Sequence, residues 1–195
     1  MKTELKPTLW RTARALANAD RLNLMRLVVN ANGDRGVSEI ALDAGLSVPT
    51  TSIYLRALNA RGLISVIRSG SHVYYGMKSD RSLPFAVSLQ MAFRKFLGGK
   101  EMPSNWENSL LPIFKAYSNP RREIMISILF KNNSLSYKEF RTHSQLCKSS
   151  FLRHLNILID AGLVVYDLNG LYSLAKPKNS FEEIFLAAFN DSSFL

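Results

Sequence analysis

The sequence lacks several features that would place it in particular protein classes. It contains one cysteine, Cys147, which excludes an internal disulfide framework and a zinc site built from several cysteines. No run of about 20 nearly uncharged apolar residues occurs, so we expect no transmembrane helix. Residues 1–22 are charged and have no central apolar run, which argues against a secretory signal. We therefore expect a cytoplasmic protein.

Catalytic signatures are missing as well. The chain has no glycine-rich phosphate loop, no nucleophile elbow and no metalloprotease motif. His143, Cys147 and His154 are ligand types for zinc or copper, but a helix-turn-helix corner would separate the first two. Cys147 near a helix start leaves a redox switch open beside an inert thiol. We expect no enzyme activity, no metal and no cofactor.

What the sequence does contain is an apolar content of 47% and an excess of basic residues. It has 25 Lys and Arg against 15 Asp and Glu, a net charge of +10. Residues 1–100 hold 15 basic and 6 acidic residues (+9), whereas residues 101–195 hold 10 and 9 (+1). This one-sided excess predicts a polyanionic partner, either nucleic acid or an anionic membrane surface, and predicts that the first half dominates its binding.

An internal repeat organises the chain. A shift of 101 residues pairs Asn18 with Asn119 and Arg21 with Arg122. A shift of 100 gives six identities, which are Glu39/Glu139, Leu46/Leu146, Leu55/Leu155, Leu58/Leu158, Gly62/Gly162 and Leu63/Leu163. Self-similarity at a fixed spacing is the signature of repeated structural units. The sequence therefore predicts two copies of one module.

Each copy has the pattern of a winged helix. Apolar spacing predicts helices over residues 8–18, 19–30, 38–44 and 48–61 in the first copy, and over 106–117, 119–131, 137–143 and 148–160 in the second. Alternating runs around Ser69-Gly70-Ser71 and around Asn169-Gly170 predict β-hairpins. Val37 is expected to be extended, with Ser38 able to cap the helix that follows.

The expected fold class is mainly α with small β-hairpin wings, arranged as two winged helix-turn-helix domains in tandem. The first domain spans 1–98 and ends with a trailing helix at 82–97. A linker rich in Gly, Pro and Ser follows at 99–105. The second domain spans 106–195 and has a C-terminal helix at 181–189.

The run SVPTTSIYLRALNARGLISVIRSGSHVYY resembles the recognition helix and wing of ArsR-like winged-helix transcriptional regulators. Their pattern is Ser-x-His-Leu-x-x-Leu-x-x-x-Gly-Leu, followed by a basic wing that contains tyrosine. Tyr54 stands where histidine is usual, whereas the second copy keeps His154 but has Leu152 in place of the serine. LANADRLNLMRLV resembles the family's Leu-x-x-x-x-Arg-Leu opening.

The resemblance implies a DNA-binding regulator, and the chain departs from the family in two ways. Family members are usually single modules that homodimerise, whereas this chain has two copies. Metal-sensing members use a cysteine-containing box before the recognition helix, and residues 38–46 contain no Cys or His. The resemblance therefore does not imply metal sensing.

The second helix of a helix-turn-helix enters the major groove, and a wing contacts phosphates or the minor groove. At 100° per residue, Val48, Thr51, Leu55 and Leu58 face inward, which leaves a mixed polar face outward. Predicted DNA contacts of the recognition helix 48–61 are Ser47, Thr50, Thr51, Ser52, Ile53, Tyr54 and Arg56. Those of the wing 65–77 are Arg68, Ser69, Ser71, His72 and Tyr74.

The second copy has a weaker pattern for DNA binding. Its wing is two residues shorter, and Asp167 at the tip repels phosphate. Its helix still offers Lys148, Ser149, Arg153 and His154 as candidate DNA contacts. The alternative is a degenerate module kept for pairing.

These observations predict a sequence-specific regulator that binds double-stranded DNA, with a prokaryotic repressor as the leading hypothesis. The two modules form an intrachain pseudo-dimer in this hypothesis, and a homodimer of the whole chain is the alternative. A plasmid-type replication initiator and a winged-helix adaptor that binds protein instead of DNA stay open as other functions. No effector is indicated.

Overall fold

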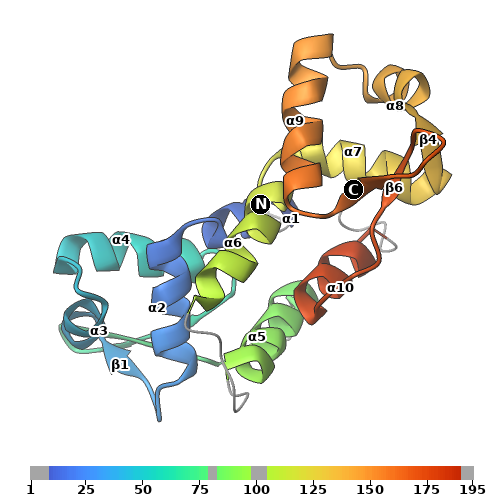
Figure 1. Cartoon of the computed structure of the whole chain (residues 1–195). Coiled ribbons are helices and arrows are strands. Elements are labelled where there is room, and N and C mark those ends of the chain that lie inside the picture. Colours follow the sequence, from blue (N-terminus) through green and yellow to red (C-terminus); the bar gives the residue numbers. More distant parts are fainter. Residues whose placement is uncertain (1–8, 79–82, 98–104, 190–195) are drawn as a thin grey trace, which may run out of the picture. The chain divides into compact units, whose positions relative to one another are not determined.

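The computed structural model describes residues 9–78, 83–97 and 105–189 (Figure 1). The described chain is mainly α-helical, with two three-stranded antiparallel sheets. The expected fold class, helices with small β-hairpins in a winged helix-turn-helix, is thereby confirmed. No described helix has the length and apolar content that crossing a membrane requires.

The chain divides into two compact units whose boundaries differ from those predicted. One unit is Ala15–Leu111, and the other combines Met1–Arg14 with Pro112–Leu195. Helices α1 (Leu9–Leu16) and α6 (Trp106–Tyr117) therefore each contribute to both units. Of the predicted linker 99–105, all but the last residue lies outside the described residues.

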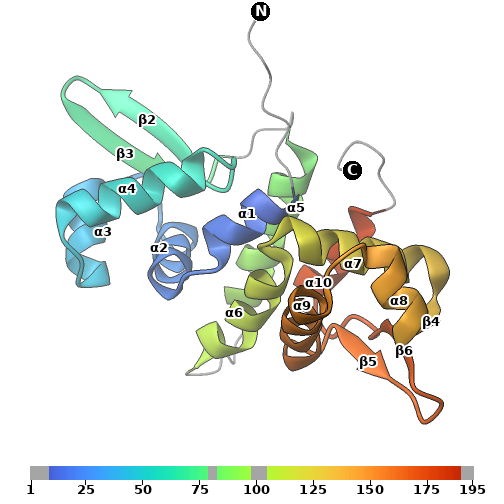
Figure 2. The same ribbon diagram turned by 90° about the horizontal axis from the view of Figure 1, so that it is seen from above.

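The first unit contains one complete winged helix. Its elements are α2 (Ala19–Val29), β1 (Arg35–Gly36), α3 (Val37–Ala44), α4 (Val48–Asn59), β2 (Ser65–Ser69), β3 (His72–Gly76) and α5 (Pro84–Leu97). The strands are ordered β1-β3-β2. Figure 2 shows the β2–β3 hairpin projecting beside α4. The predicted helices and hairpin of this half are present, with ends shifted by one or two residues.

Side-chain caps and a glycine turn set the limits of these helices. Asn18 Oδ1 accepts the Arg21 N–H at 2.9 Å, and Ser47 Oγ accepts the Thr50 N–H at 3.3 Å. Gly45 ends α3 in the left-handed conformation, with φ of 65°. Ser38 does not cap α3, because the helix already begins at Val37 and its N-cap residue is Gly36.

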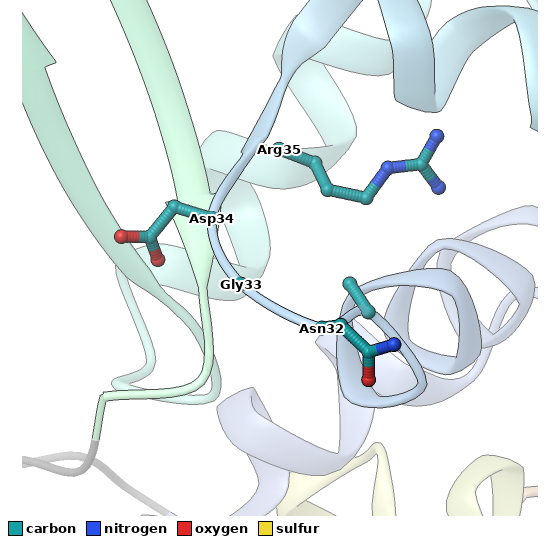
Figure 3. Close-up of a pocket in the computed structure, with 5 residues that line it drawn as sticks. Asn32, Gly33, Asp34 and Arg35 are labelled. Carbon is teal, nitrogen blue, oxygen red and sulfur yellow. The ribbon is translucent and has the colours of Figure 1, made fainter.

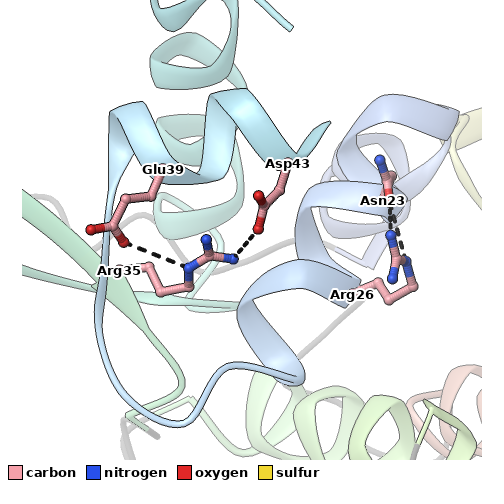
Figure 4. Close-up of polar contacts among 5 residues, drawn as sticks. All are labelled: Asn23, Arg26, Arg35, Glu39 and Asp43. Atoms are coloured by element: carbon pink, nitrogen blue, oxygen red, sulfur yellow. Dashed lines mark hydrogen bonds and ion pairs between the residues drawn. The ribbon is translucent and has the colours of Figure 1, made fainter. Parts of the chain in front are cut away.

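The extended residues before α3 are Arg35 and Gly36, two and one positions earlier than the predicted Val37. Arg35 and Gly36 pair with Tyr75 and Tyr74 of β3, which adds a third strand to the hairpin. Arg35 is held there by ion pairs of 2.7 Å to Asp43 and 3.7 Å to Glu39 (Figure 4). These carboxylates lie on α3, so the sheet and the helix-turn-helix are joined through one guanidinium.

The core of this unit is the inner face of α4 packed against α2. Leu55, Leu58, Leu22 and Met25 are fully buried there. Helix α5 closes the carboxyl end of α4, because the buried Gln90 amide donates to the carbonyls of Gly62 at 3.0 Å and Leu63 at 3.1 Å. Gln90 thus provides hydrogen-bond donors for two backbone carbonyls at the turn that leads into the wing.

The second unit repeats the order of elements from α2 to β3. These are α7 (Pro120–Asn132), β4 (Ser134–Ser136), α8 (Tyr137–Ser144), α9 (Lys148–Asp160), β5 (Val164–Tyr166) and β6 (Leu171–Leu174), followed by α10 (Ser180–Ala187). The strand order β4-β6-β5 corresponds to that of the first sheet. That both halves derive from one duplicated module stays a prediction.

Aromatic side chains fill the core of the second unit. Phe151 of α9 meets Phe140 of α8 edge to face at 5.2 Å between centroids. Phe185 of α10 stacks on Tyr117 at 4.4 Å. Such pairs add about 0.5–1.5 kcal/mol beyond the burial of their area. These aromatic contacts pack α10 and α9 into the core of the second unit.

An arginine occupies the same place in both modules, half-buried as Arg21 and buried as Arg122. Arg21 Nε donates to the carbonyl of Ala15, and Arg122 Nε donates to that of Ala116 at 2.7 Å. Arg122 also donates to the Lys115 carbonyl at 2.6 Å. Each guanidinium satisfies carbonyls at the end of the preceding helix, which would otherwise lack partners. The pairing of these arginines at an offset of 101 therefore has a structural cause.

Gly62 provides a test of how α4 is joined to the wing. Its φ is +69°, and a Cβ there would overlap the Leu83 side chain and make a tight contact with that of Ala86. We predict that Gly62→Ala lowers the free energy of unfolding by about 2 kcal/mol or more, since left-handed strain and crowding add.

Gly70→Ala is the matched control for that substitution, and urea unfolding measures the free energy of unfolding of both variants. Gly70 has φ of +58°, and a Cβ added there would meet no atom within 4 Å, so Gly70→Ala has strain alone. Equal losses for the two variants would contradict the packing argument.

A buried carboxyl group links α1 to α7 within the second unit. Glu123 is 9% exposed, and its carboxylate accepts the backbone N–H of Trp10. Burial raises the pKa of Glu123 to about 7, and the Trp10 N–H opposes this rise. The carboxyl group is therefore protonated in the folded protein at a pH where it is ionised in the unfolded chain.

This shift predicts a loss of stability at higher pH. A folded-state pKa above the unfolded value stabilises below the unfolded pKa of about 4.5, and this contribution disappears as the pH rises through about 7. Glu123→Gln removes the titration. Thermal unfolding should show the variant gaining stability relative to the wild type between pH of about 5 and about 8. Parallel pH profiles would contradict it.

Candidate nucleic-acid interface

The outer face of α4 is exposed and mixed in character. Ile53 is 57% exposed, and Arg56 lies one turn later on the same face. The inner stripe is Thr51, Leu55 and Leu58, as the helical spacing predicts. Val48 was predicted to face inward, and this is wrong: it is 46% exposed, because the buried stripe begins one turn later at Thr51.

Thr51 cannot be a DNA contact. Its side chain is fully buried, and its Oγ1 has no hydrogen-bond partner in the described part of the chain. Its spacing of four and seven residues from Leu55 and Leu58 places it on the packed face. The prediction that Thr51 touches DNA was therefore wrong, although its inward orientation was expected from the same spacing.

The wing presents its polar residues at the tip. Ser69 pairs with His72 across the turn, where Gly70 has φ of 58°. Ser69, Ser71 and His72 are exposed, as is Arg68 in the preceding strand. These side chains are free to approach a phosphate backbone.

The two neighbouring tyrosines of β3 face opposite ways. Tyr75 is 3% exposed, whereas Tyr74 is half-buried and lies 6.3 Å from the His72 ring. Burial raises the pKa of Tyr75, and the charges of Arg56 and Arg68 oppose that rise. The pKa of Tyr75 thus responds to Arg56 of α4 and to Arg68 of the wing. Both predicted contact elements therefore contribute a positive charge near this side chain.

Tyr54 is held by the arginine of the opening helix. The Arg21 guanidinium carbon lies 5.4 Å from the centre of the Tyr54 ring, at cation–π distance. Tyr54 is half-buried, so its ring has a packing role in addition to any outward contact. Sequence reasoning did not connect Arg21 with this helix, although the repeat had marked it.

In the second unit, α9 places its predicted residues in two different settings. Lys148, Ser149 and Arg153 are exposed. His154 is 4% exposed, with its Nδ1 3.4 Å from Arg122 Nη1. The prediction that His154 contacts DNA was therefore wrong, because the ring packs against the buried arginine of α7.

Electrostatics around His154 identify a residue that the sequence did not. Burial lowers the pKa of His154, followed by the charges of Arg122, Arg153 and Arg121. Arg121 is exposed, and its Nη1 donates to the Ser150 Oγ of α9 at 3.2 Å. The one feature of the sequence that could have indicated Arg121 is its position directly before Arg122, which the internal repeat pairs with Arg21.

The candidate chemistry around Cys147 does not assemble into a metal site. Cys147 is the exposed N-cap residue of α9, where a hydrogen bond with Ser149 lowers the pKa of the thiol. The His143 Nδ1 lies 2.7 Å from the Glu139 carbonyl. Within the described ranges, no three side chains of the His, Cys, Asp or Glu type come together as metal ligands.

A depression at the end of α2 also offers no ligand-binding site, because its charged side chains have local structural roles. It is lined by Ala31–Arg35, with the Asp34 carboxylate pointing toward the sheet and the Arg35 guanidinium the other way (Figure 3). Gly76 of β3 makes room for Asp34, since a Cβ there would overlap its carboxylate. These charges therefore serve the local fold.

The predicted site residues fall into three groups. Thr51 and His154 are buried. Half-buried are Thr50, Ser52, Tyr54 and Tyr74. Exposed are Ser47, Ile53, Arg56, Arg68, Ser69, Ser71, His72, Lys148, Ser149 and Arg153. Most of the predicted set is thus accessible to a partner.

Comparison with known proteins identifies the family of the first helix-turn-helix. The profile described as "bacterial regulatory protein, arsR family" matches residues 18–66. Residues 18–66 form an ArsR-family helix-turn-helix domain. The match begins at the N-cap of α2 and ends in β2. The ArsR-family domain therefore contains α4, whose exposed face is described above.

A curated relative of this domain is the HTH-type transcriptional regulator Rv0324 of Mycobacterium tuberculosis. It is 38% identical over 79 residues, which are 40% of this chain and 34% of the relative. The chain thus matches about a third of that regulator's length.

Two solved structures from Mycobacterium bovis are also similar in sequence. One is the solution structure of a homodimeric winged helix-turn-helix DNA-binding domain, a possible ArsR-family transcriptional regulator, with 33% identity over 42% of this chain and 73% of that chain. The other is the crystal structure of a possible transcriptional regulatory protein, with 32% identity over 47% and 96%. The TM-scores are 0.34 and 0.36.

The buried hydroxyl of Thr51 gives a test of the assignment of faces on α4. Thr51→Val keeps the shape and removes an unpartnered polar group, so the free energy of unfolding should rise by about 1 kcal/mol. Duplex DNA affinity should not change. The control is Thr50→Val at the half-buried neighbour, which should leave stability nearly unchanged. A loss of stability in Thr51→Val would contradict the assignment.

Proposed function

We propose that this protein is a transcriptional regulator that binds double-stranded DNA through its ArsR-family domain. The observation that carries the proposal is the exposed face of α4, which lies beside the β2–β3 hairpin (Figure 2), with Arg56 exposed on the helix and Arg68 exposed on the hairpin. A helix with an adjoining hairpin is the arrangement with which winged helices engage a major groove and the flanking backbone.

Helix α4 supplies the contacts to bases in this proposal. Ile53 is apolar and exposed, so it can meet a thymine methyl group in the major groove. The hydroxyl of Thr50 can donate to or accept from a base edge, although Ser47 Oγ lies 2.8 Å from it in the unbound protein. Arg56 can reach a guanine or a phosphate.

The wing supplies contacts to phosphate. Other guanidiniums of the module are engaged locally: Arg35 pairs with Asp43, and Arg26 bonds the Asn23 side chain at 2.7 Å (Figure 4). Arg68 lies in an exposed strand and pairs with no carboxylate among the described residues. It is therefore the cation of the wing that can neutralise a phosphate.

The regulator acts as a repressor in this proposal, by occupying a promoter in the cytoplasm of a prokaryote. Two recognition helices on adjacent half-sites come from the two modules of one chain or from a homodimer. Homodimerisation is stated for the Mycobacterium bovis domain. A replication initiator would instead require repeated sites at an origin.

One observation favours a second role for the other module. Its wing exposes Tyr166 at 65% and Leu168 completely, and the backbone N–H groups of Asn169 and Leu171 donate to Asp167 within the same turn. An apolar tip braced by a carboxylate suits protein contact better than phosphate contact. This wing would then serve as an adaptor surface while the first module binds DNA.

The proposal predicts different effects for the helix and the wing. Arg68→Ala should weaken binding to all duplexes several-fold and reduce the slope of log affinity against log salt by about 0.9, because one phosphate contact is lost. Thr50→Val should change base preference by about 1–3 kcal/mol at one position. Fluorescence anisotropy over a salt series and selection from a random duplex pool measure these effects.

Arg26→Ala is the matched control, since it removes one charge whose guanidinium is already bonded to Asn23. It should leave the salt slope nearly unchanged. If Arg68→Ala and Arg26→Ala behave alike, the wing does not contact phosphate and the proposal for it is wrong.

A further inference from the structure

The first module has the larger net positive charge, whereas the second module has the more positive recognition helix at two corresponding positions. The first module has most of the net positive charge of the chain, yet α4 begins with Val48 and exposes Ile53. At the corresponding positions, 100 residues later, α9 has Lys148 and Arg153, both exposed. Net charge per module therefore does not describe the surface that would meet DNA.

The opening helices show the same reversal. Arg121 precedes the buried Arg122, whereas Asp20 precedes Arg21 at the offset of 101. Arg121 extends to α9, where it donates to Ser150 Oγ at 3.2 Å. In exchange, α9 has Asn156 where α4 has Arg56. Across these four positions, the second module gains three cations and loses an anion and one arginine.

Arg121 reaches Ser150 of α9, which lies three residues before Arg153. No carboxylate in the described part of the chain forms an ion pair with Arg121, Lys148 or Arg153. Both ion pairs found among the described residues belong to Arg35 in the first module. Burial and then the charge of Arg153 lower the pKa of Arg122, and three arginines act together on His154. Like charges held close together are unfavourable until an anion binds, and guanidiniums match phosphate geometry well.

We propose that Arg121, Lys148 and Arg153 form a phosphate-binding surface for duplex DNA, so that the second module supplies much of the sequence-independent affinity. This inference rests on the proposed DNA binding and reverses the expectation from net charge. The short wing of the module takes no part, because residues 164–174 contain no cation and Asp167 lies at the tip. The first module then contributes base readout through α4 and the single phosphate contact of Arg68.

The test is the salt dependence of binding to a fluorescent duplex of arbitrary sequence, which isolates the phosphate contribution. The double variant Arg121→Ala/Arg153→Ala should lower the slope of log affinity against log salt by about 1.8, as expected for two lost phosphate contacts. Affinity at moderate salt should fall about tenfold or more.

The control is Lys131→Ala/Lys176→Ala, which removes the same charge from exposed positions of the same unit outside α9 and the start of α7. Its slope should change by less than half as much. Equal changes in the two double variants would overturn the inference, since only net charge would then matter.

Arg121→Lys separates charge from structure. It keeps the cation but loses the guanidinium that reaches Ser150, so it should retain most of the salt slope. If it behaves like Arg121→Ala, the effect is structural and the inference fails. A wild-type chain without duplex binding would refute the proposed function itself, whereas normal wild-type binding with an unchanged slope in the double variant refutes this inference alone.

Discussion

Each module depends on one guanidinium at the start of its second helix, which is half-buried in Arg21 and buried in Arg122. Arg21 and Arg122 bond the carbonyls that end the preceding helix, and each also meets an aromatic side chain of the recognition helix, Tyr54 or His154. Because this bonding fixes three helices relative to one another within the module, the orientation of α4 or α9 follows from it.

Because packing fixes the inner side of each recognition helix, only the residues on its outer side are available to contact DNA. Two inner positions are the same in both modules, with leucines at 55, 58, 155 and 158, whereas the buried Thr51 of α4 corresponds to Phe151 of α9. The outer positions have diverged, to Ile53 in one and Arg153 in the other. A common scaffold thus presents an exposed isoleucine on the mixed face of α4 and a cation at the same position of α9, which suit a thymine methyl group and a phosphate respectively.

Local patterns in the sequence were sufficient for the elements and insufficient for their partners. The period of 3.6 residues and the caps at Asn18 and Ser47 define where helices begin, since both act over a few residues. The bonds of Gln90 to residues 62 and 63, and of Arg122 to His154, join positions about 30 residues apart that no local pattern relates. Thr51 shows the remaining difficulty: its hydroxyl suggested DNA, whereas its position on the helix determined burial.

The central claim is that α4 contacts bases while α9 contacts phosphates. The most direct measurement is interference mapping on a duplex selected from a random pool, with deoxyuridine replacing each thymine and methylphosphonate replacing each phosphate in turn. Base replacements should weaken binding in one half-site, and the effect there should vanish in Ile53→Ala. Phosphate replacements should weaken binding most in the other half-site, in a manner that depends on Arg153. Base effects of equal size in both half-sites would contradict the claim.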